Sequence, residues 1–225
     1  MIRRGLFVTG TDTGVGKTWV GTQIAALLRR EGVPVAPRKP VESGCERRGG
    51  ELVPADGEAY HRAVNETQPL AQITPYRLHH AISPQRAAQL EQADTTLEHL
   101  LAAALAGVGE DAFLLVEGAG GFYSPLALDG SNADLAERLG LPVLLVAPDR
   151  LGVINHVHLS LEAIRHRRLP VFAVVLNGLD DGVPPQGMDN LEDLCRLPCP
   201  VFQTQCGVAL TQGDPLVRAL LAANA

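Results

Sequence analysis

Lysine, cysteine and long apolar runs are all scarce in this 225-residue sequence. No stretch reaches the roughly 18 unbroken apolar residues that a transmembrane helix needs, so we expect no membrane association. Acidic residues outnumber basic ones, 25 to 19, and the formal net charge is −6. Because nucleic-acid-binding proteins normally carry a basic field, this balance argues against a nucleic-acid partner. The apolar run 5–10 is too short for a signal-peptide core, so we expect a cytoplasmic protein.

The four cysteines do not form a metal-binding pattern. Cys195, Cys199 and Cys206 gather near the C-terminus. Their spacing lacks the Cys-x₂-Cys knuckle of zinc sites, and no histidine is close to them in sequence. We therefore expect reduced thiols without a role in the chemistry, as is usual inside cells.

Only two of the 19 basic residues are lysines, Lys17 and Lys39. Arginine supplies positive charge everywhere else, so a retained lysine points to a place that needs a compact ammonium group. Chance is the alternative explanation. It is weakened because both lysines fall inside the motifs that point to phosphate chemistry, and we treat both as candidate catalytic residues.

Short apolar runs alternate with amphipathic segments along the chain. Runs that are apolar throughout are typical of buried parallel strands, so the pattern predicts an α/β fold, with a mainly parallel sheet and helices on both faces. The glycine- and arginine-rich stretch 46–50 is expected to be a surface loop. No long linker divides the sequence, which predicts a single domain over residues 1–225. The expected strands are 5–10, 33–41, 112–116, 142–147, 170–176 and 200–202, and the expected helices are 17–30, 95–108, 133–139 and 153–167.

A glycine-rich loop, Thr9–Thr18, joins the first expected strand to the first expected helix. Glycines let backbone N–H groups surround phosphate oxygens, and the helix N-terminus adds partial positive charge. In such loops the lysine reaches the β- and γ-phosphates and the next hydroxyl binds Mg²⁺, which assigns roles to Lys17 and Thr18. Gly10 lies six residues before Gly16, one more than in the usual spacing. A turn that binds nothing is the alternative, but the strand–loop–helix context favours a P-loop NTPase-like fold.

Three more charged residues are expected at the same edge of the sheet. Lys39 opens the motif KPVESG after the second strand, and Glu117 belongs to VEGAGG after the third clear strand. Ligands of parallel sheets bind beyond the carboxyl ends of the strands. We therefore expect Lys17 and Lys39, from two neighbouring strand ends, to converge on the same phosphoryl oxygens. Glu117 and Asp56 suit Mg²⁺, which prefers oxygen ligands; Asp56 could equally be a helix N-cap, and Lys39 a surface lysine.

Two other classes of P-loop protein remain as alternatives. ParA- and MinD-like nucleotide switches carry a second lysine inside the loop, where this sequence has Asp12. Ligases of the cobyrinate-synthase branch usually carry an additional glutaminase domain, for which 225 residues leave no room.

Six segments occur in the order seen in dethiobiotin synthetases: GTDTGVGKT, KPVESG, VEGAGG, LPVLLV, LGVINH and VVLNG. Over about residues 5–178 the sequence resembles that family. The resemblance implies an ATP- and Mg²⁺-dependent ligase that closes a ureido ring on 7,8-diaminononanoate with CO₂, releasing ADP and phosphate. It also implies a homodimer, with Lys17 and Lys39 as catalytic residues and with Mg²⁺ bound by Thr18, Asp56 and Glu117.

The same resemblance assigns the remaining site residues. Asn177 matches an asparagine that binds adenine, and segment 151–155 matches one that receives the substrate carboxylate across the dimer, although Asn155 could be a plain helix cap. The family's C-terminal Ile-Pro-Trp-type segment is not recognisable at 200–205, so base selectivity stays open. The nucleotide-binding set is Gly14, Val15, Gly16, Lys17, Thr18, Trp19, Asp56, Glu117, Gly118, Ala119, Gly120, Asn177 and Gly178, and the substrate-binding set is Thr13, Ser43, Gly121, Leu151, Gly152 and Asn155.

Overall fold

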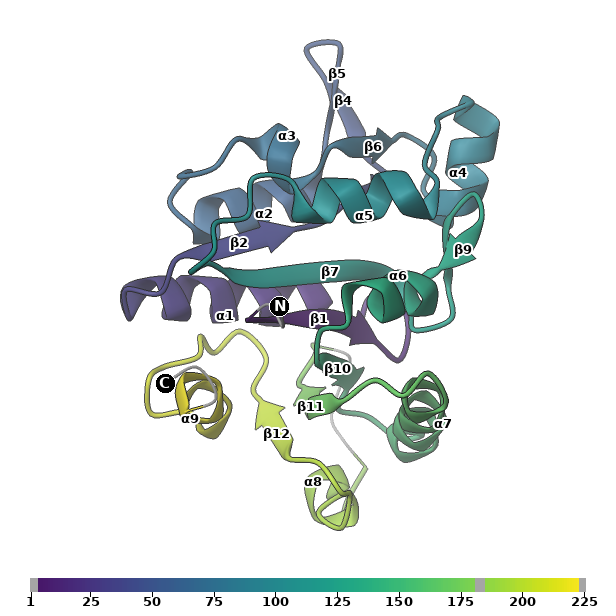
Figure 1. Ribbon diagram of the computed structural model, residues 1–225. Coiled ribbons are helices and arrows are strands. Elements are labelled where there is room, and N and C mark those ends of the chain that lie inside the picture. Colours follow the sequence, from purple (N-terminus) through teal and green to yellow (C-terminus); the bar gives the residue numbers. More distant parts are fainter. Residues whose placement is uncertain (1–3, 181–184, 223–225) are drawn as a thin grey trace.

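A six-stranded parallel sheet forms the centre of the computed structural model, which describes residues 4–180 and 185–222 (Figure 1). Its strand order is β12-β11-β10-β1-β7-β2, and every neighbouring pair is parallel. The mainly parallel sheet expected from the sequence is confirmed. The strands are β1 (Gly5–Gly10), β2 (Val35–Arg38), β7 (Phe113–Gly121), β10 (Val143–Pro148), β11 (Val171–Asn177) and β12 (Val201–Thr204).

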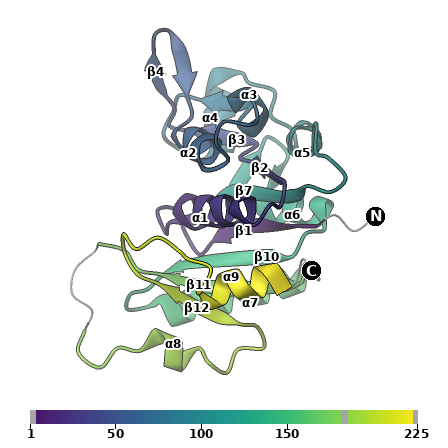
Figure 2. The ribbon, with the colours of Figure 1, turned by 90° about the vertical axis from the view of Figure 1, so that its left-hand side faces the viewer.

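Helices cover both faces of this sheet, as Figures 1 and 2 show. Successive side chains of a strand point to opposite faces. Accordingly, Leu6 and Val8 of β1 pack into one core and Phe7 packs into the other. Burial on both faces explains why the strands read as continuous apolar runs. The first core contains residues of α1 (Lys17–Arg30), α2 (Ala55–Ala63), α3 (Leu70–Ile73) and α9 (Pro215–Ala222), and the second contains residues of α4 (Pro84–Glu91), α5 (Leu97–Leu105), α6 (Asn132–Leu139) and α7 (Val153–His166).

The expected strand 33–41 is wrong in extent. The chain leaves the main sheet after β2, and β3 (Val41–Ser43) instead pairs with β6 (Tyr76–Leu78) in a separate parallel pair. Pro40 stands at the break, where a residue without an N–H group cannot continue the hydrogen-bond ladder. Lys39 is therefore the first residue beyond the carboxyl end of β2.

Stretch 46–50 is not an irregular loop. It belongs to a hairpin of β4 (Glu46–Arg48) and β5 (Glu51–Val53) that projects from the molecule (Figure 1). A second hairpin joins β8 (Pro125–Ala127) to β9 (Gly130–Ser131) and leads into α6. The short helix α8 (Asn190–Asp193) precedes β12.

Strand β7 lies between β1 and β2. The expectation that the two lysines come from neighbouring strand ends is therefore wrong, because Glu117 on β7 comes between them. Within the two described ranges, no helix is long and apolar enough to cross a membrane.

Candidate active site

A cavity of about 660 Å³ opens beside the phosphate loop and the carboxyl ends of β7 and β2. Many of the expected site residues lie in its wall: Thr13, Gly14, Gly16, Lys17, Thr18, Lys39, Ser43, Asp56, Glu117, Ala119 and Gly120. The wall also contains residues that the sequence did not single out: Glu42, Ala81, Ile82, Ser83, Pro84, Ser124 and Pro125. The remaining expected residues lie outside this wall: Val15, Trp19, Gly118, Gly121, Leu151, Gly152, Asn155, Asn177 and Gly178.

The phosphate loop is held by a close contact with β11. Gly16 precedes α1 with a left-handed backbone (φ 90°), and a Cβ there would lie 2.1 Å from Nδ2 of Asn177. Glycine is therefore required for both conformation and space. Asn177 donates to the Val15 carbonyl (3.1 Å) and accepts from the Thr204 hydroxyl (2.7 Å). The asparagine assigned to adenine thus also braces the loop.

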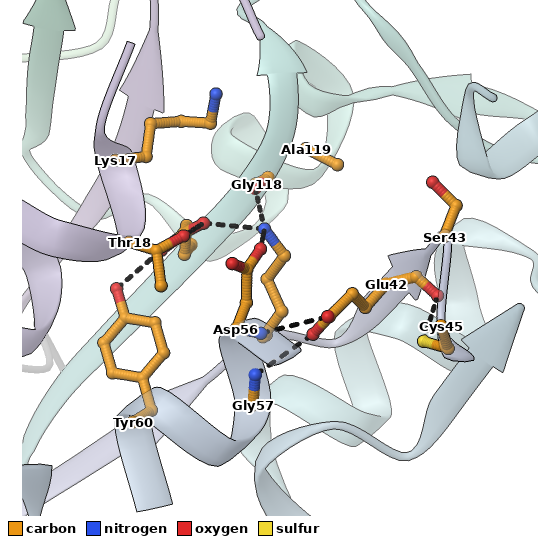
Figure 3. Close-up of polar contacts among 12 residues, drawn as sticks. Lys17, Thr18, Glu42, Ser43, Cys45, Asp56, Gly57, Tyr60, Gly118 and Ala119 are labelled. Carbon is orange, nitrogen blue, oxygen red and sulfur yellow. Dashed lines mark hydrogen bonds and ion pairs between the residues drawn. The ribbon is translucent and has the colours of Figure 1, made fainter. Parts of the chain in front are cut away.

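Both lysines face the cavity, but they are held differently. The Lys17 ammonium donates to the Asp12 carbonyl (2.9 Å). Lys39 is buried, and its ammonium contacts three acceptors: Oε1 of Glu117 (2.6 Å), Oδ2 of Asp56 (2.8 Å) and the Gly118 carbonyl (3.0 Å). Figure 3 shows the contacts around Asp56 and Gly118, with Lys17 at the upper left and outside the dashed lines. Lys39 is therefore not a surface lysine.

Burial and the charges of this cluster shift the pKa values of Lys17, Lys39 and Asp56. Burial opposes the charge on Lys39, but Glu117 and Asp56 outweigh burial and raise the pKa of Lys39. Burial likewise opposes the charge of Asp56, yet the Lys39 ammonium holds the pKa of that carboxyl below its usual range. Burial, together with the positive charge of Lys39, lowers the pKa of Lys17 to about 8. Lys39 is thus fixed in its charged form, while the lowered pKa of Lys17, about 8, lets this ammonium lose its proton at mildly basic pH.

Glu42 is the most important wall residue that the sequence did not indicate. Its two carboxylate oxygens accept hydrogen bonds from the backbone N–H groups of Asp56 and Gly57, each at 3.0 Å. A residue of β3 therefore caps α2, and the alternative of Asp56 as the N-cap is wrong. Asp56 instead lies in the first turn, where its side chain reaches Lys39. Burial and the neighbouring Asp56 charge raise the pKa of Glu42.

The opposite wall is built from segments distant in sequence. Ser43 donates to the Ile82 carbonyl (2.6 Å), which joins β3 to the wall segment 81–84. Asn132, fully buried at the start of α6, pairs with both the N–H and the carbonyl of Ala119 and also donates to the carbonyls of Gly121 and Ser124. These bonds hold the chain that follows Glu117.

The oxygen atoms around Lys39 fit a hard divalent cation. The Thr18 hydroxyl lies 2.9 Å from Oε1 of Glu117, and both Glu117 and Asp56 contact the same ammonium. A hydroxyl and two carboxylates are the donors that Mg²⁺ prefers. Across residues 4–180 and 185–222, no group of three or more His, Cys, Asp or Glu residues is suited to a metal. An ion bound here would take further oxygens from water and nucleotide phosphates.

The segment assigned to the substrate carboxylate lies away from the cavity wall. Gly152 precedes α7, Leu151 is 77 % exposed, and Asn155 is exposed. The four cysteines are all free.

Two solved structures share the overall fold at low sequence identity. The signal recognition particle receptor FtsY from Elizabethkingia anophelis matches with a TM-score of 0.50 and 16 % identity, covering 96 % of this chain and 65 % of that chain. A nucleotide-binding protein from Archaeoglobus fulgidus, in complex with ADP, matches with a TM-score of 0.50 and 12 % identity, covering 98 % and 86 %. The parallel sheet and the glycine loop leading into Lys17 define the chain as a P-loop protein of the α/β class.

A family model described as an AAA domain matches residues 4–199. The ATP-dependent dethiobiotin synthetase BioD of Anaeromyxobacter dehalogenans strain 2CP-C is 41 % identical over 194 residues, which are 86 % of this chain and 85 % of the relative. The protein of the same name from Halalkalibacterium halodurans is 38 % identical over 200 residues, covering 88 % and 81 %. The chain belongs to the dethiobiotin synthetase family.

Proposed function

We propose that this protein is an ATP-dependent dethiobiotin synthetase. It carboxylates 7,8-diaminononanoate with CO₂ and closes the ureido ring, converting ATP to ADP and phosphate. The observation that carries the proposal is the placement of Lys17 and Lys39 in the wall of one cavity, with Glu117 and Asp56 beside them. Family membership supplies the identity of the substrate.

The chemistry needs charge neutralisation and alignment more than covalent help. One substrate amine takes up CO₂ as a carbamate, whose oxygen attacks the γ-phosphorus and displaces ADP. The second amine then attacks the carbonyl carbon of the mixed anhydride, expels phosphate and loses a proton to solvent. Negative charge builds on the phosphoryl oxygens in the first step, where preorganised cations stabilise the transition state.

Each lysine suits this task in a different way. Lys39 keeps its charge because Glu117 and Asp56 raise its pKa, and three acceptors fix its position. Lys17 is the first residue of α1. Phosphates bind well beside a helix N-terminus, so its ammonium is placed to contact the nucleotide phosphates. Thr18, Asp56 and Glu117 would hold a magnesium ion, which would supply further positive charge beside the phosphates.

The other assigned residues complete the proposal. Thr13 and Ser43, both in the cavity wall, contact the diamine and the carbamate. Asn177 contributes to base recognition through the donor and acceptor capacity that its two protein bonds leave free. The segment 151–155 acts across a homodimer, where its helix N-terminus receives the substrate carboxylate of the partner site. We further propose one domain over residues 1–225, whose ends lie outside the described residues, and a cytoplasmic location.

The direct test is turnover by the purified protein. With 7,8-diaminononanoate, bicarbonate, ATP and Mg²⁺, we expect dethiobiotin by mass spectrometry and equimolar release of ADP and phosphate. Omission of the diamine should abolish nucleotide cleavage beyond background. Absence of product with ATP and with the other common nucleotides would reject the proposal.

A further inference from the structure

Tyr60 is a buried polar residue that the proposed chemistry does not use. Its side chain on α2 is fully buried, and its hydroxyl donates a 2.8 Å hydrogen bond to Oε2 of Glu117. Figure 3 shows the ring extending from α2 toward the carboxylate cluster, beside Thr18. A buried tyrosine needs a partner for its hydroxyl, but an apolar residue could have filled the same space.

The contact divides the two oxygens of Glu117 between different tasks. Oε1 faces Thr18 and Lys39, at 2.9 and 2.6 Å, while Oε2 is occupied by the Tyr60 hydroxyl. Rotation about the last torsion of a glutamate is only weakly restricted. A fixed donor on Oε2 therefore determines the plane of the carboxylate and the direction in which Oε1 points.

A glycine in α1 makes this contact possible. Gly21 lies in the interior of α1, where glycine costs about 1 kcal/mol of helix stability relative to alanine. A Cβ at this position would lie 1.8 Å from the Tyr60 hydroxyl oxygen. Because Gly21 has no side chain, the Tyr60 hydroxyl has room to reach Glu117.

We propose that Tyr60 is a positioning residue that orients Glu117 toward the magnesium ion of the bound nucleotide, and that Gly21 is the notch that admits it. This inference rests on the proposed role of Glu117 as a magnesium ligand. Groups that hold a metal ligand in place commonly change metal affinity or activity by about 10- to 100-fold when removed.

The test compares ADP affinity with Mg²⁺ and with EDTA, measured by titration calorimetry on the full chain. Tyr60→Phe removes only the hydroxyl. We expect the gain in ADP affinity that Mg²⁺ provides to fall by about 10-fold or more, with ADP affinity in EDTA unchanged. Tyr76→Phe is the matched control, because the Tyr76 hydroxyl makes no hydrogen bond to any described residue, and it should keep the full gain. An unchanged gain in Tyr60→Phe, or an equal loss of affinity in EDTA, overturns the inference.

Two further variants make the outcome specific. Gly21→Ala should reduce the magnesium-dependent gain in ADP affinity when Tyr60 is present. In the Tyr60→Phe background the same substitution should cause a much smaller further reduction, since the two residues act through one contact. Additive losses overturn the role of Gly21. Glu117→Gln tests the underlying assignment. If it too keeps the full gain, the proposed magnesium role of Glu117 fails; if only Tyr60→Phe keeps the gain, the positioning role alone fails.

Discussion

Lys39 occupies an unusual position for a catalytic cation, because it neutralises the carboxylates proposed to bind the metal. Its ammonium contacts Glu117 at 2.6 Å and Asp56 at 2.8 Å. Lys39→Gln removes a cation from the phosphoryl site, and losses of this kind cost about 10²–10³-fold in kcat. We expect a loss of that size in dethiobiotin formation, measured with saturating ATP. Unchanged turnover would contradict the assignment.

The same substitution should also affect stability, in a way that depends on Mg²⁺. Removing one partner of a buried ion pair commonly costs about 3–5 kcal/mol. We expect the free energy of unfolding of Lys39→Gln to fall in EDTA, with partial recovery when Mg²⁺ and ADP are added. Urea unfolding under both conditions measures this difference, and an equal loss in both would indicate a purely structural lysine.

Lys17 makes nucleotide binding sensitive to pH. Its pKa is lowered to about 8, chiefly because burial disfavours the ammonium and Lys39 lies nearby. Bound phosphates attract the charged form, so ADP affinity should fall as pH rises above 8, by at most about tenfold per pH unit. Titration calorimetry between pH 7 and pH 9 measures the slope. Lys17→Arg keeps its charge over this range, so the ADP affinity of this variant should depend less on pH. An ADP affinity of the wild-type protein that does not change between pH 7 and pH 9 contradicts the prediction.

The effect of Lys17 on folding has the opposite sign. Its folded pKa is below its unfolded pKa, so between pH 8 and pH 10.5 the unfolded chain binds more protons than the folded chain. The contribution of Lys17 to the free energy of unfolding therefore rises with pH across this window. Nucleotide binding is thus expected to weaken above pH 8 while the destabilising effect of the Lys17 charge on the fold diminishes.

Helix α2 is the element on which the carboxylate cluster depends. It carries Asp56 and Tyr60, and its first turn is fixed by Glu42 from β3. Glu42→Ala should lower the free energy of unfolding by about 0.5–2 kcal/mol, as other lost helix caps do. Hydrogen exchange should speed up at the amides of Asp56 and Gly57. Glu42→Gln, which keeps an oxygen acceptor, is the milder control, and unchanged exchange at both amides in the alanine variant would disprove the capping role.

Elements with a strong local pattern could be predicted from the sequence. Helix α1 spans the expected residues 17–30, and the capping box at Ser131 marks the start of α6. Strands β10 and β11 were recognisable because they are almost wholly apolar. By contrast, α2 mixes polar and apolar residues without a clear stripe, and β6 has only three residues. The sequence carries too little signal for either.

The candidate site was predictable only in part, for a related reason. Lys17, Thr18, Lys39 and Glu117 stand in motifs that end strands or begin helices, and all line the cavity. The contacts of Glu42, Tyr60 and Gly21 join elements that are distant along the chain. No local rule indicates which carboxylate will cap which helix, or that a helical glycine makes room for a tyrosine.

For the whole molecule, the proposed homodimer places segment 151–155 at the interface between two copies. Leu151, just before α7, is 77 % exposed; on α7 itself, Leu159 is 58 % exposed and lies one helical turn after the exposed Asn155. If this surface is the homodimer interface, Leu151→Asp with Leu159→Asp should give a monomer by light scattering. We expect the KM for the diamine to rise while ADP affinity is kept. A monomeric wild-type protein, or a double variant that stays dimeric, would contradict this arrangement.

Both lysines of the chain lie in the cavity wall, 7 % and 3 % exposed. An endoproteinase that cuts after lysine therefore has one favourable cleavage point, the Lys17–Thr18 bond, because Lys39 is followed by proline, and the folded backbone protects that bond. Digestion must wait for this region to open, so its rate reports the opening equilibrium when closing is fast. A nucleotide that binds only the closed form slows digestion in proportion to its occupancy. Because lysine is so scarce in this sequence, the rate of digestion after lysine reports nucleotide binding at the cavity.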